Sequence, residues 1–81
     1  MKLEIIKIDK IIFEGEVSRI KAVSPGGHFE ILDGHAPLVA ALKAGPLWIE
    51  ETRDDRGLLH TFDLLGGMMK VTPRKVVVLA E

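Results

Sequence analysis

Residues 47–65 carry the sequence LWIEETRDDRGLLHTFDLL, in which two apolar runs flank a charged centre. The run at residues 47–52 begins with Leu, Trp and Ile, and the run at residues 58–65 is rich in Leu with one Phe. Residues 53–57 hold two Arg, two Asp and one Gly. Short apolar runs joined by a polar, glycine-containing turn are typical of a β-hairpin. This stretch therefore predicts two strands with a solvated tip at residues 53–57.

The same pattern extends along the whole chain. Turn-forming Gly, Pro, Ser and Asp residues recur at residues 9–10, 24–27, 33–34, 45–46, 66–67 and 72–75. The apolar runs between these turns lie at residues 3–8, 11–23, 29–32, 68–71 and 76–80. This alternation predicts an antiparallel all-β sandwich or barrel. At the turn formed by Gly66 and Gly67 we expect at least one positive φ angle, which glycine tolerates.

One segment favours a different structure. Residues 37–45 begin with Pro37, continue with good helix formers and end with Gly45. Pro at the first helical position and Gly just past the last one are the ordinary boundaries of a helix. Local propensity therefore predicts a short helix here, although two turns of helix yield easily to tertiary pairing.

Composition bounds the class of protein. The 81 residues and 8.9 kDa allow one domain, residues 1–81, with a thin core. Eleven Lys and Arg against twelve Asp and Glu give a net charge of −1, which argues against a nucleic-acid partner. The longest stretch without Asp, Glu, Lys or Arg is nine residues, 34–42, so no spanning helix is expected, and the cytoplasm is the expected location.

Catalytic and metal-binding patterns are weak in this sequence. There is no Cys, and His28, Asp33 and His35 match no defined metal-ligand spacing. Ser18 and Ser24 do not occupy a nucleophile elbow, and no glycine pair is followed by the Gly-Lys-Ser/Thr of a phosphate loop. We therefore expect neither enzymatic activity nor a bound cofactor.

Protein binding remains the best-supported class. Trp48 and the pair Met68-Met69 suit either the core or an interface, since Trp is favoured at protein contacts and Met packs adaptably. An apolar share of 47% in a thin domain also favours an exposed apolar patch, which marks a partner surface. From the residues alone, the chain is expected to be a small β-domain that binds other proteins.

A longer set of motifs extends this interpretation. The blocks are GHFEILDGHAPL (residues 27–38), LKAG (42–45), GGMMKV (66–71) and VVVLA (76–80), with LEII (3–6) and FEGEV (13–17) at the start. In this order and spacing, from residue 2 to residue 80, the sequence resembles the epsilon subunit of bacterial F-type ATP synthases.

The resemblance implies a ten-stranded antiparallel β-sandwich, or flattened β-barrel, with residues 37–44 largely in a strand rather than a helix. It implies a non-catalytic rotor subunit of the central stalk, bound to subunit gamma and to the c-ring. This subunit would be a single copy within a hetero-oligomer, without direct membrane insertion, at the cytoplasmic face of the bacterial plasma membrane. Its role would be to couple c-ring rotation to the catalytic head.

The resemblance also assigns candidate contact residues. His35, Val39 and Lys7 fall on or near the face that the family turns toward gamma, with the alternative that the turn around His35 only positions a strand. His28 and Glu30 fall on the edge that meets the c-ring. The family often carries a Glu followed two residues later by Gly, where this sequence has His28 and Glu30. We expect Glu30 to take over the carboxylate contact, with Phe29 between them pointing inward. The alternative is that His28 and Glu30 form a solvated pair on an exposed strand.

Two alternatives stay open from the sequence. One is a free-standing β-barrel module that binds a peptide or small ligand in its mouth. The other is an oligonucleotide-binding barrel, which the net charge of −1 and the four aromatic residues disfavour. The family commonly continues past the sandwich into a two-helix hairpin, and the sequence leaves open whether such a hairpin is naturally missing after Glu81.

Overall fold

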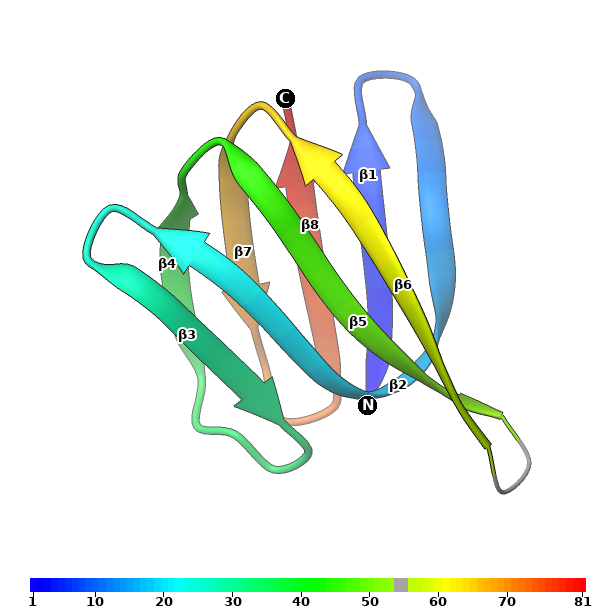
Figure 1. Cartoon of the computed structure of the whole chain (residues 1–81). Coiled ribbons are helices and arrows are strands. Elements are labelled where there is room, and N and C mark those ends of the chain that lie inside the picture. The colour runs from blue at the N-terminus through cyan, green and yellow to red at the C-terminus, as the bar shows by residue number, and fades with distance from the viewer. Residues whose placement is uncertain (54–55) are drawn as a thin grey trace.

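The computed structural model describes residues 1–53 and 56–81, and within them the chain forms strands and turns without a helix (Figure 1). These residues form eight strands: β1 (Lys2–Lys7), β2 (Lys10–Ser24), β3 (Gly27–Leu32), β4 (Leu38–Leu42), β5 (Gly45–Arg53), β6 (Arg56–Leu64), β7 (Gly67–Val71) and β8 (Lys75–Ala80). Every apolar run predicted above coincides with a strand, so the all-β class is confirmed. No described helix is long and apolar enough to cross a membrane.

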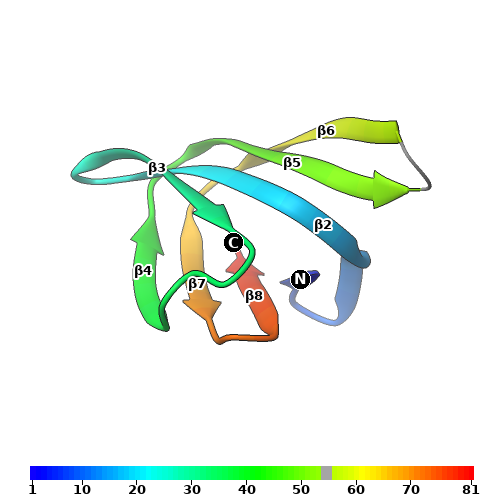
Figure 2. The same cartoon turned by 90° about the horizontal axis from the view of Figure 1, so that it is seen from below.

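The strands form one sheet that folds over into two layers (Figure 2). Layer 1 contains β4, β7, β8, β1 and the first half of β2, in that order. Layer 2 contains β3, the second half of β2, β5 and β6. Strand β2 has 15 residues and belongs to both layers, so it joins them covalently.

The sandwich class is as expected, but two details differ from the ten antiparallel strands that the resemblance implied. The described residues form eight strands, partly because β2 serves both layers without a break. In addition, β1 and β8 pair in parallel, from Lys2 opposite Lys75 to Ile6 opposite Leu79. Parallel neighbours need a long connection, and here the whole chain between β1 and β8 supplies it.

A bulge in β2 keeps its apolar residues inside as it passes between the layers. Val17 lies opposite Glu51 and Arg19 lies opposite Glu50, so Ser18 is an extra residue in β2. In a regular strand, Val17 and Ile20 would face opposite sides, because they are three residues apart and successive side chains alternate. With it, Val17 is 1% exposed and Ile20 is fully buried. The bulge therefore makes the two-layer core continuous.

The core lies between the layers and is aliphatic, in keeping with an aromatic content of 5%. Its fully buried large side chains come from both layers and are Leu3, Ile5, Val17, Ile20, Ile31, Leu47, Ile49, Met69, Val76 and Val78. Phe13, Phe29 and Phe62 pack against this cluster from its margins. Trp48 is not a core residue, because it alternates with buried Leu47 and Ile49 and therefore points outward.

The helix favoured by local propensity at residues 37–45 is wrong. Residues Leu38–Leu42 form β4, which pairs with β7 along its full length, from Leu38 opposite Val71 to Leu42 opposite Gly67. A two-turn helix has few internal hydrogen bonds, whereas pairing with β7 satisfies the backbone groups and buries Leu42. The strand implied by the family resemblance is confirmed.

The predicted turns are also present. Gly66 and Gly67 have φ angles of 139° and 148°, so the expectation of a positive φ at this turn is confirmed. The hairpin quoted first exists as β5 and β6, paired from Gly45 opposite Leu64 to Arg53 opposite Arg56. Residues 54–55 of its expected tip lie outside the described residues.

Candidate functional site

The outer face of layer 1 carries a row of apolar side chains. The strand registers place Ala41, Met68, Leu79, Ile6 and Ile11 directly beside one another, one from each of β4, β7, β8, β1 and β2. Met68, Leu79 and Ile11 are 48%, 56% and 55% exposed. We call these five residues the apolar row. Side chains of this kind are rarely gathered at a soluble surface unless a partner covers them.

A second row runs beside the apolar row on the same face. It consists of Val39, Lys70, Val77, Glu4 and Glu14, which the registers again place side by side. Val39 is exposed and extends the apolar surface, whereas Glu4 is buried and forms an ion pair with Lys75. The hydrogen bond from Lys75 holds the pKa of Glu4 below its ordinary value, against the opposing effect of burial. The charge of Glu4 next to the apolar row is therefore compensated, whereas Glu14 at the end of the second row is exposed.

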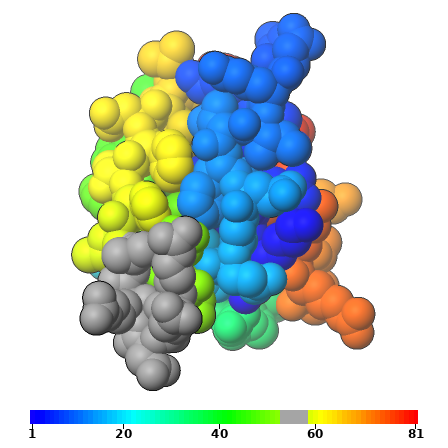
Figure 3. Space-filling model, turned by 90° about the vertical axis from the view of Figure 1, so that its right-hand side faces the viewer, coloured from blue at the N-terminus to red at the C-terminus, as the bar shows by residue number. Residues whose placement is uncertain are grey.

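The residues expected to face gamma are only partly brought together. Val39 lies on the outer face of layer 1, close in sequence to His35 in the β3–β4 loop. Lys7 ends β1, next to the β1–β2 turn, which lies at the opposite end of the layer from the β3–β4 loop (Figure 1). Ile8 follows Lys7 and is 89% exposed, and this turn projects from the body of the molecule (Figure 3). Lys7 thus flanks the other end of the face that carries Val39.

The side chain of His35 is held by its own loop. Its backbone N–H donates to the carbonyl of Leu32 at 3.1 Å, and its ring Nδ1 lies 2.7 Å from the carbonyl oxygen of Ala36. These contacts shape the turn before β4, which agrees with the positioning role left open for this residue. A contact of His35 with gamma stays a prediction.

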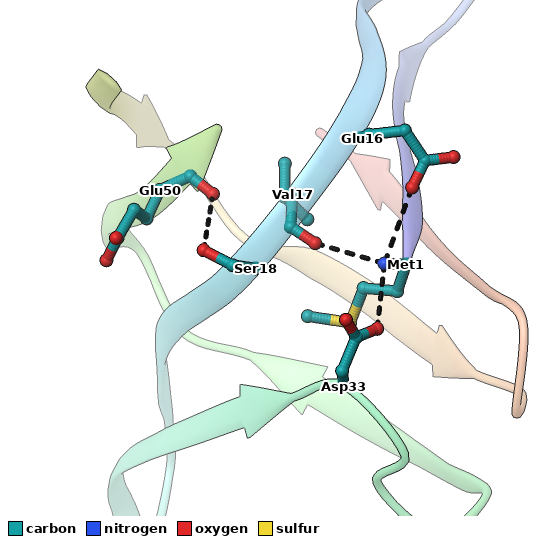
Figure 4. A network of polar contacts seen from close by, with 6 residues as sticks. All are labelled: Met1, Glu16, Val17, Ser18, Asp33 and Glu50. Atoms are coloured by element: carbon teal, nitrogen blue, oxygen red, sulfur yellow. Dashed lines mark hydrogen bonds and ion pairs between the residues drawn. The ribbon is translucent and has the colours of Figure 1, made fainter. Parts of the chain in front are cut away.

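The chain start anchors the same loop, a contact that the sequence analysis missed. The Met1 ammonium donates to Asp33 Oδ1 at 2.8 Å and to the Val17 carbonyl at 3.1 Å, and it lies 3.4 Å from Glu16 Oε2 (Figure 4). The hydrogen bond to Asp33 raises the pKa of this ammonium. The network ties the β3–β4 loop to β1 and β2. Asp33 and Met1 are 32 residues apart, so no local sequence signal indicates the contact.

The residues expected to face the c-ring lie together on β3. His28 and Glu30 both point outward, and Phe29 between them packs against the core as predicted. Glu30 approaches Arg19 at 3.6 Å, and Arg19 approaches Glu50 at the same distance. The edge strand β3 therefore presents the imidazole of His28 and the carboxylate of Glu30, which shares Arg19 with Glu50.

His28 also takes part in an aromatic contact with Trp48. Their ring centroids are 5.8 Å apart with an angle of 23° between the planes, which is a stacked arrangement. The stack crosses over β2, because β3 and β5 flank that strand in layer 2. Of the two roles left open for Trp48, the structure excludes the core and leaves a surface role.

The three side chains considered as metal ligands have separate partners. His28 stacks on Trp48, Asp33 binds the Met1 ammonium and His35 contacts Ala36. Within residues 1–53 and 56–81, no group of three His, Asp or Glu side chains is placed to hold a metal ion.

The chain is similar to known proteins over its whole length. The whole chain, residues 1–81, matches the family model described as ATP synthase, Delta/Epsilon chain, beta-sandwich domain. It is 37% identical to the ATP synthase epsilon chain of Chlorobaculum tepidum, over 98% of this chain and 86% of the relative. It is 32% identical to the epsilon chain of Acinetobacter baylyi, over all of this chain and 56% of the relative.

Solved structures give the same fold. One chain in the Euglena gracilis mitochondrial ATP synthase, described as OSCP/F1/c-ring, superposes with a TM-score of 0.86 at 25% identity, over 96% of this chain and 48% of that one. A chain in the central stalk/c-ring structure of the Tetrahymena thermophila mitochondrial enzyme superposes with a TM-score of 0.81 at 23% identity, over 99% and 62%. The second of these likenesses concerns the fold alone.

Proposed function

Because the chain belongs to the β-sandwich family of ATP synthase delta and epsilon chains, we propose that it transmits c-ring rotation to subunit gamma in the central stalk. As an epsilon chain it is a subunit of the synthase and not a catalytic one. It joins a membrane-associated hetero-oligomer, and in this proposal it sits at the cytoplasmic face of the bacterial plasma membrane.

The apolar row is the observation that carries this proposal. Met68, Leu79 and Ile11 are each about half exposed, on three strands that belong to one layer. Burying such side chains against a partner is favourable at about 25 cal/mol per Å² of apolar surface. We assign this face, with Val39 beside it, to gamma. His35 and Lys7 then border the contact at the two ends of layer 1.

The contact with the c-ring is assigned to a different part of the molecule. His28 and Glu30 lie on β3, which belongs to layer 2 and pairs only with β2 among the described strands. Polar loops are suitable partners for such an edge, since exposed charged groups add modest energy but orient the contact. The two layers share β2 and one continuous core, so in this proposal they turn together and torque applied at β3 reaches the apolar face.

The experiment compares matched charge insertions on the two layers. Leu79→Glu places a carboxylate in the apolar row, and Leu59→Glu places one on β6 in layer 2; these leucines are 56% and 79% exposed, so both variants should fold. We expect Leu79→Glu to weaken binding to gamma by about tenfold or more and to reduce proton pumping per ATP hydrolysed. We expect Leu59→Glu to leave gamma binding unchanged. Equal loss in the two variants, or none in Leu79→Glu, contradicts the assignment.

A further inference from the structure

The outer face of layer 2 contains a hollow that shares only His28 with the proposed contact to the c-ring. Its volume is about 370 Å³, and its lining includes Lys21 from β2, His28 from β3, Trp48 and Glu50 from β5, and Leu59 and Thr61 from β6. Pockets for small ligands begin at about 300 Å³. The hollow is open to solvent and large enough for one small molecule.

The hollow contains a planar aromatic surface. Trp48 is the only Trp in the chain, and the alternation of β5 directs it outward, where it stacks with His28 at 5.8 Å. Aromatic faces attract other planar groups in offset stacks. Leu59, on the neighbouring strand β6, is 79% exposed and provides an apolar side wall. This part of the hollow suits a flat ring.

The hollow also contains a cation, Lys21, that forms no ion pair with the described residues. Lys21 lies directly opposite Trp48 on one side and Glu30 on the other. Glu30 and Glu50 both approach Arg19 at 3.6 Å, whereas no carboxylate of the described residues lies within 4.0 Å of the Lys21 ammonium. The positive charge of Arg19 is therefore compensated, and Lys21 can take an anion beside the aromatic surface.

We propose that this hollow binds a small planar aromatic carboxylate. The ring lies against Trp48 and His28, and the carboxylate accepts hydrogen bonds from the Lys21 ammonium. A charge-assisted hydrogen bond next to a stacking surface distinguishes such a ligand from a neutral ring and from a simple anion. This proposal does not depend on the assignment of the apolar row, which lies on the other layer.

The test uses the single tryptophan as its reporter. Trp48 gives the only indole N–H signal in a ¹H–¹⁵N spectrum of the full chain. We would titrate the chain with benzoate, with benzyl alcohol as the ring without the charge, and with acetate as the charge without the ring. We expect benzoate to shift the Trp48 signal saturably, with a Kd about tenfold lower than that of either control.

Matched lysine variants locate the anion contact. Lys21→Gln should raise the Kd for benzoate about tenfold, whereas Lys70→Gln, an exposed lysine on the outer face of layer 1, should leave it unchanged. Benzoate shifts that do not saturate, that match those of acetate or benzyl alcohol, or that persist in Lys21→Gln would overturn the proposal. None of these results bears on gamma binding, so the two proposals fail separately.

Discussion

The two layers contribute similar inner faces but very different outer faces. Buried Ile, Leu and Val residues line the core from both sides. Outside, layer 1 presents the apolar row, with the charged residues Glu4, Glu14 and Lys70 in the second row beside it. Layer 2 instead presents Arg19, Lys21, Glu30 and Glu50 around a stacked Trp48. Since a strand alternates its side chains, one set of residues can satisfy folding while the other is free to serve recognition.

This difference separates two kinds of interaction. An apolar face gains binding energy from burial and requires a complementary partner. A face of exposed charges contributes orientation and is sensitive to salt, because the Debye length is about 8 Å at physiological ionic strength. If this separation holds, substitutions on the inner faces lower the free energy of unfolding, and substitutions on the outer faces weaken binding.

The largest expected effect concerns the close approach of β7 and β8 at Gly67 in layer 1. A Cβ atom at Gly67 would lie 2.2 Å from the carbonyl oxygen of Leu79, on the neighbouring strand, and the φ of Gly67 is 148°. Because this obstacle is backbone, β7 would have to move away from β8. We expect Gly67→Val to lower the free energy of unfolding by about 3–4 kcal/mol, measured by urea denaturation.

Gly66→Val is the matched control for this prediction. A Cβ atom there would lie 3.2 Å from a carboxylate oxygen of Glu81, a flexible side chain that can move. Its φ of 139° still disfavours valine, so we expect a loss of about 1–2 kcal/mol. Equal losses in the two variants would show that backbone strain alone, and not the contact between β7 and β8, sets the cost.

Adjacent methionines test the division between inner and outer faces directly. Met69 is fully buried, and Met68 is 48% exposed in the apolar row. We expect Met69→Ala to lower the free energy of unfolding by about 2–4 kcal/mol, because it leaves a cavity. Met68→Ala should change it by less than about 0.5 kcal/mol and weaken binding to gamma instead. A loss of stability in Met68→Ala together with a loss of gamma binding alone in Met69→Ala would contradict the separation of inner and outer faces.

Stability should fall at both alkaline and acid pH, for two different reasons. The alkaline limb comes from the contact of the Met1 ammonium with Asp33, and the acid limb from the ion pair of Glu4 with Lys75. The pKa of the Met1 ammonium is raised above its ordinary value of 8.0, chiefly by the hydrogen bond to Asp33. Its contribution is therefore full below pH 8 and is lost as the pH rises through the folded-state pKa. The pKa of Glu4 is lowered below 4.5 by Lys75, so its contribution is present above that value and is lost as the pH falls through the folded-state pKa.

Two variants assign these limbs. Asp33→Asn should flatten the alkaline limb and lower stability at pH 7 by about 0.5–1 kcal/mol, since Asp33 is largely exposed. Glu4→Gln should flatten the acid limb and leave the alkaline one intact. Urea denaturation at intervals between pH 3 and about 10 measures both. A pH profile that neither variant alters would exclude these groups as its source.

The smallest expected effect lies on β3. Glu30 shares the Arg19 cation with Glu50, at 3.6 Å from each carboxylate, so loss of Glu30 should not disturb the fold. We expect Glu30→Ala to weaken binding to the c-ring by up to about 1 kcal/mol at low salt, with little effect at high salt. His28→Ala should have less effect. A larger loss in His28→Ala would refute the idea that Glu30 supplies the carboxylate contact.

Much of the fold was predictable because it depends on local pattern. The apolar runs and the turns at Gly66-Gly67 and at residues 72–75 fixed where strands begin and end, and Phe29 was placed inward by simple alternation. The family blocks at residues 27–38 and 66–71 indicated the family, which the comparisons then showed. The outward placement of His28 and Glu30 followed from the same two-residue period.

Other features arise only when distant segments meet. Residues 37–45 favour a helix by themselves, and only pairing with β7 makes Leu38–Leu42 a strand. The Ser18 bulge, the parallel pairing of β1 with β8 and the bond between Met1 and Asp33 likewise depend on partners far along the chain. The sequence by itself determined which residues could be buried. Tertiary structure decided which outward residues became neighbours, because cross-strand register and not chain order sets proximity on a sheet.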